Sequence, residues 1–386
     1  MASNTANTRP PSPVWLVLSL LWLAGGYTAA LFVCGIPWTA AWWQGLACVA
    51  AAPFCLFAAV FFVAAPKRLY RRLPRPAIKA LRMAGAGAQV IAPWLLWSAL
   101  VRLMNRIAWP QALATGGWIA GFSFACGAVL LYLSRPRAKD VRLVEIEVPI
   151  PDLPHVFDGY RILHLSDLHA THAATAAQKL EKARGLEADL IAFTGDLTEE
   201  LELLEAGARA LGSLEARDGR FAVPGNHDHW LGAARVREAL SSAGYQTLVN
   251  EHVVITRDDC QLYLAGVDDS SYLEEDDLDA ALQGIVDDGV VVLLSHAPDV
   301  VRKPLFRRAA LILAGHTHGG QISLPGYGPL YVPSRLGRTY AAGPYQLGNT
   351  LLFVSRGLGE VFPSMRINCP REIALITLRR KPTGPP

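Results

Sequence analysis

Residues 1–139 of this 386-residue chain contain no aspartate and no glutamate, although they contain 13 lysines and arginines. Residues 140–386 therefore hold 23 of the 36 basic residues and all 33 acidic ones, a net charge of −10 in a chain of net charge +3. Proteins bind nucleic acids mainly through lysine and arginine on the phosphates. The acidic C-terminal part is a poor match for such a ligand, so we expect no nucleic-acid partner.

Cysteine is scarce, and its spacing excludes two kinds of site. The six cysteines form no C-x-x-C pair, and four of them lie within apolar runs. This pattern indicates neither a disulfide framework nor a thiolate zinc site.

Charge is missing altogether from residues 10–66. A membrane-spanning helix needs about 20 apolar residues, so this segment is long enough for two, with a break at 34–39. Further apolar runs at about 83–101 and 112–133 bring the expected number of transmembrane helices to four. A cleaved signal peptide is disfavoured, because the apolar sequence continues past any cleavage point. The runs contain no Asp, Glu or His, which favours an anchor over a transporter.

Basic residues between the runs predict the orientation. Residues 67–82 carry seven Lys and Arg, and residues 134–139 carry three more directly after the fourth run. Loops rich in these residues stay in the cytoplasm. Four spans place both clusters there, so we expect the rest of the chain on the cytoplasmic side.

From residue 141 the sequence alternates between strand and helix patterns, which predicts an α/β domain over 141–380 after an all-α membrane region at 1–140. Wholly apolar strands such as 290–294 indicate sheets covered on both faces. The expected strands are 141–148, 160–167, 188–196, 219–228, 252–256, 261–267, 289–299, 308–318, 349–357 and 372–378. The expected helices are 175–186, 204–214 and 232–243.

Five of the apolar strands end in residues that bind metals. In chain order these are Asp167 and His169, Asp196, then Asn226, His227 and Asp228, then His296, and finally His316 and His318. Carboxyl ends of strands converge on the crevice where open α/β sheets bind ligands. Imidazole and carboxylate without thiolate suit manganese, iron or zinc. Any one of these blocks is compatible with an ordinary turn, but five at strand ends predict a metal site.

The blocks read D-x-H, G-D, G-N-H-D, H and G-H-x-H, and in this order they resemble the calcineurin-like metallophosphoesterase superfamily. The resemblance implies an αββα sandwich, in which two sheets are flanked by helices. The run GHTHGGQI at 315–322 is similar to a bacterial membrane-associated branch that includes analogues of the UDP-2,3-diacylglucosamine hydrolases.

Carried over residue by residue, the resemblance implies a centre of two divalent ions. Manganese is the expected metal, and iron and zinc are the alternatives. One ion would be held by Asp167, His169 and His318. The other would be held by Asn226, His296 and His316. Asp196 would bridge both, since a carboxylate offers two oxygens. His227 would face the substrate and protonate the leaving group, and Asp228 would orient it.

The expected activity is hydrolysis of a phosphodiester or pyrophosphate by a water that the metal ions activate. The membrane region favours a lipid-linked substrate, for example a nucleotide-linked lipid such as UDP-2,3-diacylglucosamine. Soluble or cyclic nucleotides are the enzymatic alternative. The alternative of another class is a non-catalytic membrane scaffold, which Asp196 and His227 disfavour because a degenerate site would be expected to lose them.

Two segments are candidates for substrate selection, the acidic loop at 268–279 and the loop at 325–346 that is rich in Tyr, Gly, Pro and Arg. The expected location is the bacterial inner membrane, with several passes and the catalytic domain in the cytoplasm. Nothing in the sequence indicates an oligomeric state.

Overall fold

The computed structural model describes residues 140–361 and 364–381. The four predicted membrane spans lie outside these residues, and so does most of the predicted region 1–140. Among the described residues no helix is both long and apolar enough to cross a membrane. The division of the chain at residue 140 therefore stays a prediction.

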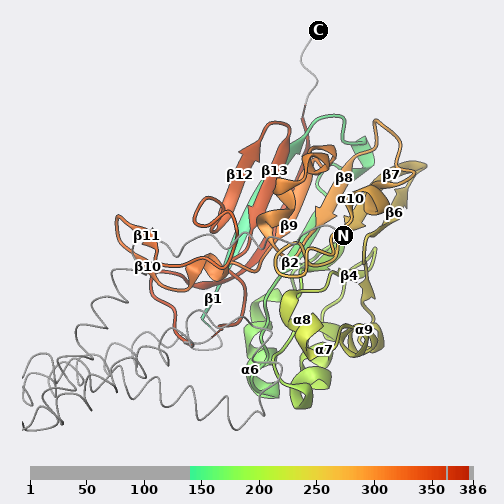
Figure 1. Ribbon diagram of the computed structural model, residues 1–386. Coiled ribbons are helices and arrows are strands. Elements are labelled where there is room, and N and C mark those ends of the chain that lie inside the picture. The colour runs from blue at the N-terminus through green and yellow to red at the C-terminus, as the bar shows by residue number, and fades with distance from the viewer. Residues whose placement is uncertain (1–139, 362–363, 382–386) are drawn as a thin grey trace, which may run out of the picture. The chain divides into compact units, whose positions relative to one another are not determined.

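Two six-stranded sheets form the centre of the domain (Figure 1). The first has the order β1 (Val141–Ile150), β14 (Arg371–Arg380), β2 (Arg161–Leu165), β3 (Leu190–Phe193), β4 (Arg220–Ala222) and β5 (Gln246–Thr247). The second has the order β12 (Gly343–Leu347), β13 (Thr350–Val354), β9 (Leu311–Ala314), β8 (Val291–Leu294), β7 (Cys260–Gly266) and β6 (Glu251–Arg257).

Strand direction brings the carboxyl ends together. In the first sheet β2, β3, β4 and β5 are parallel, while β14 runs antiparallel to β2. In the second sheet β7, β8, β9 and β13 are parallel, and the edge strands β6 and β12 are antiparallel to their neighbours. In each sheet the carboxyl ends of several parallel strands therefore lie side by side.

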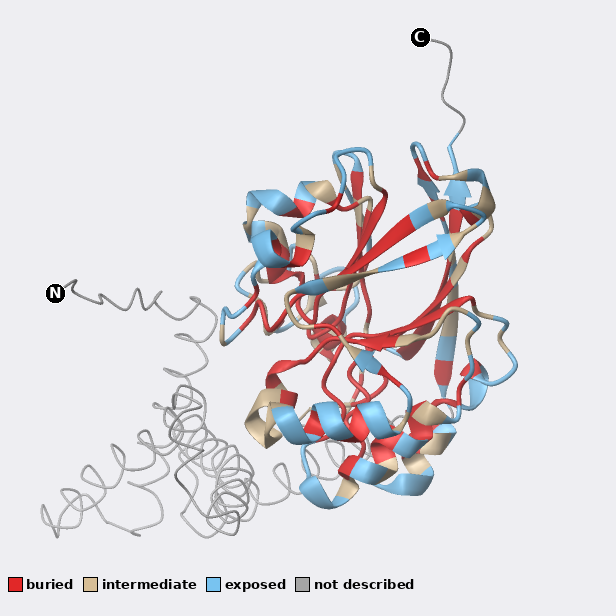
Figure 2. Cartoon of the chain, turned by 90° about the vertical axis from the view of Figure 1, so that its right-hand side faces the viewer, coloured by how far each residue is buried: buried red, intermediate tan, exposed pale blue. Residues whose placement is uncertain are grey.

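Apolar side chains fill three layers, which makes the domain a four-layer sandwich. The layer between the sheets includes Ile162, Leu264, Val292 and Leu313. Outside the first sheet a second layer packs under helices α6 (Ala173–Lys179), α7 (Leu204–Gly212) and α9 (Ala233–Ser242). A third layer covers the outer face of the second sheet with α10 (Leu278–Leu282). Figure 2 shows these helices exposed on their outer faces and buried on their inner ones, as the predicted αββα arrangement requires.

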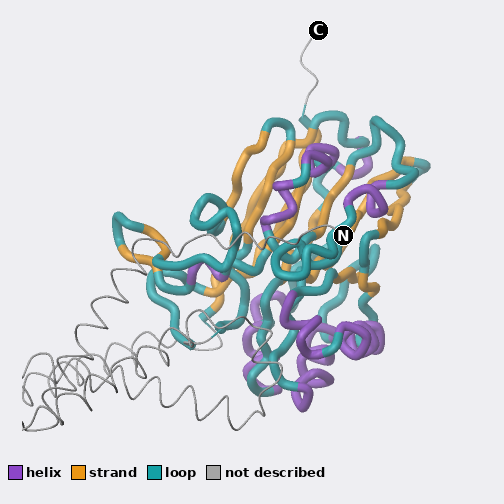
Figure 3. The backbone as a smooth tube through the Cα atoms, viewed as in Figure 1, coloured by secondary structure: helices purple, strands orange, loops and turns teal. Residues whose placement is uncertain are grey.

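Three predicted elements differ from the structure (Figure 3). The segment 219–228, predicted as a strand that runs into a polar turn, is the short β4, and helix α8 (Asn226–Leu231) begins where the turn was expected. The predicted helix 175–186 is α6 followed by a separate 3-10 turn at Glu181–Ala183. The segment 325–346, expected to be a loop, contains all but the last residue of β12 and one strand of a small hairpin of β10 (Ser323–Leu324) and β11 (Gly328–Pro329).

Candidate metal centre

The strand ends that carry the candidate ligands have an unusual backbone. Five of these residues have a positive φ, namely Asp167 (52°), His169 (38°), Asp196 (61°), His316 (67°) and His318 (50°). This left-handed region is costly for residues other than glycine and persists where the surroundings enforce it. Here the Asp167 N–H donates to the Gly195 carbonyl at 2.9 Å and the His169 N–H to the Asp196 carbonyl at 3.1 Å. Such strain clusters at functional sites.

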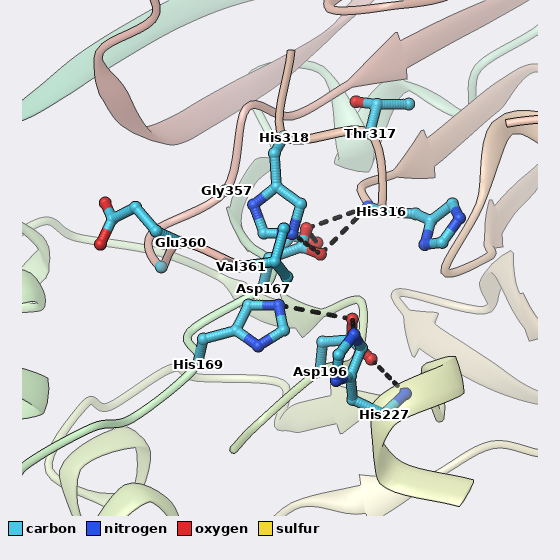
Figure 4. Close-up of polar contacts among 12 residues, drawn as sticks. Asp167, His169, Asp196, His227, His316, Thr317, His318, Gly357, Glu360 and Val361 are labelled. Carbon is cyan, nitrogen blue, oxygen red and sulfur yellow. Dashed lines mark hydrogen bonds and ion pairs between the residues drawn. The ribbon is translucent and has the colours of Figure 1, made fainter. Parts of the chain in front are cut away.

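The first group of candidate ligands comprises Asp167, His169 and His318 (Figure 4). All three are buried, although they come from β2 and β9 in different sheets. The His318 Nε2 atom lies 3.5 Å from Asp167 Oδ1, and the ring centroids of His169 and His318 are 5.0 Å apart. The structure therefore brings together the three residues expected to hold one ion.

The second group comprises Asp196, His296 and His316. The His296 Nε2 atom lies 3.4 Å from Asp196 Oδ2 and 3.1 Å from His316 Nδ1. Asn226 Oδ1 lies 3.3 Å from the same nitrogen, so the amide joins this group. The other ring nitrogen of His296 is 2.7 Å from the Thr194 carbonyl, which fixes the orientation of the ring.

Asp196 connects the two groups. Its Oδ2 atom lies 3.5 Å from His169 Nε2 and 3.4 Å from His296 Nε2, while its Oδ1 atom accepts the backbone N–H of His227 at 2.8 Å. One carboxylate oxygen thus faces ligands of both groups. A carboxylate in this position is suited to bridge two divalent ions.

Several polar atoms of the site are buried without a hydrogen bond within the described residues. They are both ring nitrogens of His169, Nδ1 of His318 and Oδ2 of Asp196. Leaving such an atom unsatisfied costs about 1–3 kcal/mol, so each calls for a partner. Nitrogen and carboxylate oxygen without thiolate form a ligand set for manganese, iron or zinc. The residues therefore fit two divalent ions.

Burial and the charge of Asp196 shift the pKa values of the candidate ligands in different directions. Burial lowers the pKa values of His169 and His318 well below the usual value, so both rings are neutral and have a lone pair to donate. Burial also lowers the pKa of His296, but the charge of Asp196 outweighs it and raises that pKa to about 10. Burial raises the pKa of Asp196, and the positive charge of His296 more than reverses this. Asp196 thus remains a carboxylate beside the protonated His296 ring, and a divalent ion bound there would displace that proton.

His227 differs from the candidate ligands in being accessible. Its side chain is 17% exposed, whereas those of Asp196 and His169 are each 1% exposed. The His227 Nε2 atom lies 3.9 Å from Asp196 Oδ2, at the rim of the group. This position fits a residue that meets the substrate.

Asp228 is placed differently from its expected role. Its carboxylate accepts the backbone N–H groups of Asp196 at 2.8 Å, Leu197 at 2.9 Å and Gly225 at 2.9 Å. These bonds fix the strand end that carries Asp196 against the start of α8. Asp228 therefore acts on the backbone around Asp196, whereas it was expected to orient the His227 ring.

Three further residues at the site were missed by the sequence analysis. Glu199 Oε1 lies 3.5 Å from His227 Nδ1 and 3.7 Å from His169 Nδ1. The ring centroid of Trp230 lies 4.5 Å from that of His227, and that of Tyr272 lies 5.6 Å from that of His316. Glu199 and Trp230 each follow a metal-binding block by two or three residues, which is the only signal the sequence offers. Tyr272 belongs to the loop at 268–279.

A sandwich that gathers imidazoles and carboxylates at its strand ends belongs to the class of metal-dependent hydrolases. The family model "Calcineurin-like phosphoesterase" matches residues 160–320, which include every candidate ligand. The chain is similar to the "Uncharacterized metallophosphoesterase YkuE" of Bacillus subtilis (strain 168), with 32% identity over 280 residues, 69% of this chain and 94% of that protein. This chain belongs to the calcineurin-like metallophosphoesterase family and is a phosphoester hydrolase.

Two more distant similarities accompany this one. The "Transmembrane protein with metallophosphoesterase domain" of Danio rerio is 30% identical over 260 residues, 63% of this chain, and the match spans 58% of that protein's length. The crystal structure of phosphopantetheinyl hydrolase (PptH) from Mycobacterium tuberculosis covers 60% of this chain and 99% of its own, at 13% identity and a TM-score of 0.34. A likeness at that level carries no argument about this chain.

Proposed function

We propose that this chain is a membrane-anchored phosphoesterase with a binuclear metal centre, which cleaves a phosphodiester or pyrophosphate bond. The observation that carries the proposal is the position of Asp196, whose Oδ2 atom lies 3.5 Å from His169 and 3.4 Å from His296. Manganese is the proposed metal, because the ligand set is imidazole, carboxylate and one amide.

Bound divalent ions would supply Lewis-acid stabilisation of the phosphoryl charge and a nucleophile from water at neutral pH. The chain's own residues contribute the rest. Asp196 Oδ1 accepts the backbone N–H of His227 and so fixes the start of α8 beside the centre. The His227 imidazole, 17% exposed at the rim, is placed to donate a proton to the leaving oxygen.

The proposed substrate is a nucleotide-linked lipid such as UDP-2,3-diacylglucosamine. An exposed apolar hairpin supports the lipid part. Residues 324–331 carry four of the nine large apolar side chains that the described residues expose, namely Leu324 (43%), Tyr327 (48%), Leu330 (49%) and Tyr331 (54%). This hairpin begins six residues after His318, and clustered exposed apolar residues mark surfaces that bind apolar partners. Soluble or cyclic nucleotides are the alternative substrates.

The proposed location is the bacterial inner membrane, with four spans in residues 1–139 and the hydrolase domain in the cytoplasm. The basic segments at 67–82 and 134–139 support this orientation. The Danio rerio relative is described as a transmembrane protein, which supports a membrane location for this chain. A reporter fused to the C-terminus tests the topology, since alkaline phosphatase is active only in the periplasm. We expect the alkaline phosphatase of the fusion to be inactive. Alkaline phosphatase activity would show that the C-terminus is periplasmic and would overturn the four-span arrangement.

The decisive experiment for function is hydrolysis of bis(p-nitrophenyl) phosphate by the full chain purified in detergent. We expect turnover with Mn²⁺ that disappears after treatment with a chelator and returns when Mn²⁺ is added. Asp196→Asn, which removes the charge that faces both ligand groups, serves as the inactive reference. Absence of metal-dependent turnover on this substrate, on UDP-2,3-diacylglucosamine and on cyclic nucleotides would favour the non-catalytic scaffold.

A further inference from the structure

An arc of aromatic rings joins the two halves of the metal centre. The ring centroids of His227 and Trp230 are 4.5 Å apart, those of Trp230 and Tyr272 are 5.7 Å apart, and those of Tyr272 and His316 are 5.6 Å apart. His227 lies at the rim of the centre and His316 belongs to the second ligand group. Trp230 and Tyr272 therefore stand beside the place where the phosphate of a substrate has to lie.

Both rings are held in place by the fold. Trp230 follows His227 by three residues in helix α8, so the two side chains share one face of the helix. Tyr272 lies in a loop anchored on Asp269, which is fully buried. The Asp269 carboxylate accepts the backbone N–H groups of Tyr272 and of Leu273, each at 3.0 Å. These bonds fix the backbone that carries the Tyr272 ring, and the ring contacts Trp230 and His316.

Packing alone does not account for the pair. Tyr272 is 38% exposed and Trp230 is half-buried, although both adjoin a centre whose candidate ligands are almost completely buried. Trp230 is the sole tryptophan of residues 140–386, since the other nine lie in residues 1–139. Rigid, partly exposed aromatic rings beside a site that binds phosphate are the parts of a stacking surface.

We propose that Trp230 and Tyr272 form a subsite for the planar aromatic ring of the substrate's organic group, such as the base of a nucleotide. This inference rests on the proposed function, because the phosphate bound at the metal centre is what brings the aromatic ring of the substrate to Trp230 and Tyr272. It selects phosphate esters that carry an aromatic ring and works without hydrogen bonds to particular base edges, so it tolerates different bases. A soluble nucleotide and a nucleotide-linked lipid both present this ring.

The test compares adenosine 5′-monophosphate with ribose 5-phosphate, which keeps the phosphate and the sugar but lacks the base. Binding of each to the Mn²⁺-loaded full chain in detergent is measured by calorimetry and by competition with bis(p-nitrophenyl) phosphate. Stacking on aromatic side chains predicts that the nucleotide binds about tenfold more tightly. Trp230→Leu and Tyr272→Leu should each remove most of this preference and leave the affinity for ribose 5-phosphate within about twofold, because the phosphate contacts remain.

Matched variants make the result specific. Trp230→Phe and Tyr272→Phe keep a ring and should retain the preference, and Tyr327→Leu, which removes an exposed tyrosine of the 324–331 hairpin, should not change it. The metal content of each variant shows whether its site has folded. Equal affinity of the wild-type chain for the two ligands would overturn the subsite, and so would an equal loss for both in Trp230→Leu.

Three further outcomes are decisive: the first tests the kind of ligand, and the other two separate this inference from the proposed function. Tighter binding of dodecyl phosphate than of the nucleotide, weakened by Trp230→Leu, would make the surface an acyl-chain site and contradict the inference. Base-dependent binding without any hydrolysis would preserve the subsite and remove the proposed activity. Hydrolysis without any preference for esters that carry an aromatic ring would preserve the proposed activity and remove the subsite.

Discussion

The His169 imidazole and the Asp196 carboxylate come from the ends of the neighbouring parallel strands β2 and β3 and face each other at 3.5 Å. Neither His169 Nε2 nor Asp196 Oδ2 has a hydrogen bond within the described residues. Two buried polar atoms that approach each other in this way satisfy each other poorly, and a cation that both bind would satisfy them together. The relationship makes metal content, rather than activity alone, the quantity that tests the site.

We expect Asp196→Asn to reduce the bound manganese of the full chain to less than half of the wild-type content. The change keeps the size of the side chain but removes the charge that faces both ligand groups. Turnover should fall about 100-fold or more. Mass spectrometry of the metal and a hydrolysis assay on the same sample measure both effects. Glu205→Gln, at an exposed position of α7, is the matched control, and wild-type metal content in Asp196→Asn would contradict the bridging role.

His227→Ala should affect turnover according to the leaving group. A proton donor matters most when the departing oxygen is strongly basic, so hydrolysis of an alkyl ester should slow about 100-fold or more. Hydrolysis of a p-nitrophenyl ester should slow less than about tenfold, because that leaving group needs little protonation. Metal content should remain that of the wild-type chain. An equal loss for both esters would assign His227 a role other than proton donor.

Gly315→Ala should prevent metal binding for steric reasons. A Cβ atom at residue 315 would collide with the side chains of Ser166 and Asp167, and Gly315 has no positive φ to add a backbone effect. We expect loss of manganese and a lower midpoint of thermal unfolding. Gly185→Ala is the control, since its Cβ would meet no atom within 4 Å while its φ is +78°. That variant should lose about 1 kcal/mol of stability and keep its metal.

The ion pairs of Glu360 should make a pH-dependent contribution to the free energy of unfolding. Its carboxylate pairs with Arg366 Nε at 3.1 Å and Arg371 Nε at 2.6 Å, and both guanidinium groups are nearly buried. Burial raises the pKa of Glu360, but Arg371 outweighs it and holds the folded-state pKa below 4.5. The stabilisation is therefore fully present above pH 4.5 and is lost as the pH falls through the lower folded-state pKa.

Glu360→Gln should accordingly lower the free energy of unfolding by about 3 kcal/mol at pH 7, because it leaves two buried cations without their anion. The difference from the wild-type chain should shrink below pH 4.5. Denaturant unfolding followed at several pH values measures it. Glu147→Gln, which breaks the exposed pair with Arg379, is the control and should cost less than about 1 kcal/mol. A difference that is constant with pH would contradict the assignment.

The metal centre was predictable because its ligands follow apolar strands directly. Asp167, Asp196 and His296 are each two or three residues beyond a strand end, and the carboxyl ends of parallel strands meet whatever the intervening sequence. The role of Asp228 was not predictable in this way. Its three backbone partners depend on the path of the β3 loop, which no local pattern encodes.

The outer parts of the site depend on aspartate side chains that bind the backbone of a loop and of a helix start. Tyr272 reaches the centre because Asp269 folds its loop, and the acidic composition of 268–279 gives no sign of that. Helix α8 was mistaken for a turn because Gly225 and Asn226 have turn propensity, whereas the capping bonds of Asp228 start a helix there. Both cases rest on hydrogen bonds between residues three or four positions apart, in which an aspartate side chain binds backbone N–H groups.

The last strand of the domain lies inside the first sheet. β14 pairs with β1 along its whole length, and part of its other side pairs with β2. It therefore lies between the two earliest strands. On a ribosome, β1 and β2 emerge more than 200 residues before their common neighbour does. The first sheet can close only after synthesis of the chain is nearly finished, and a nascent chain halted before residue 371 would display two incomplete strand edges to its chaperones.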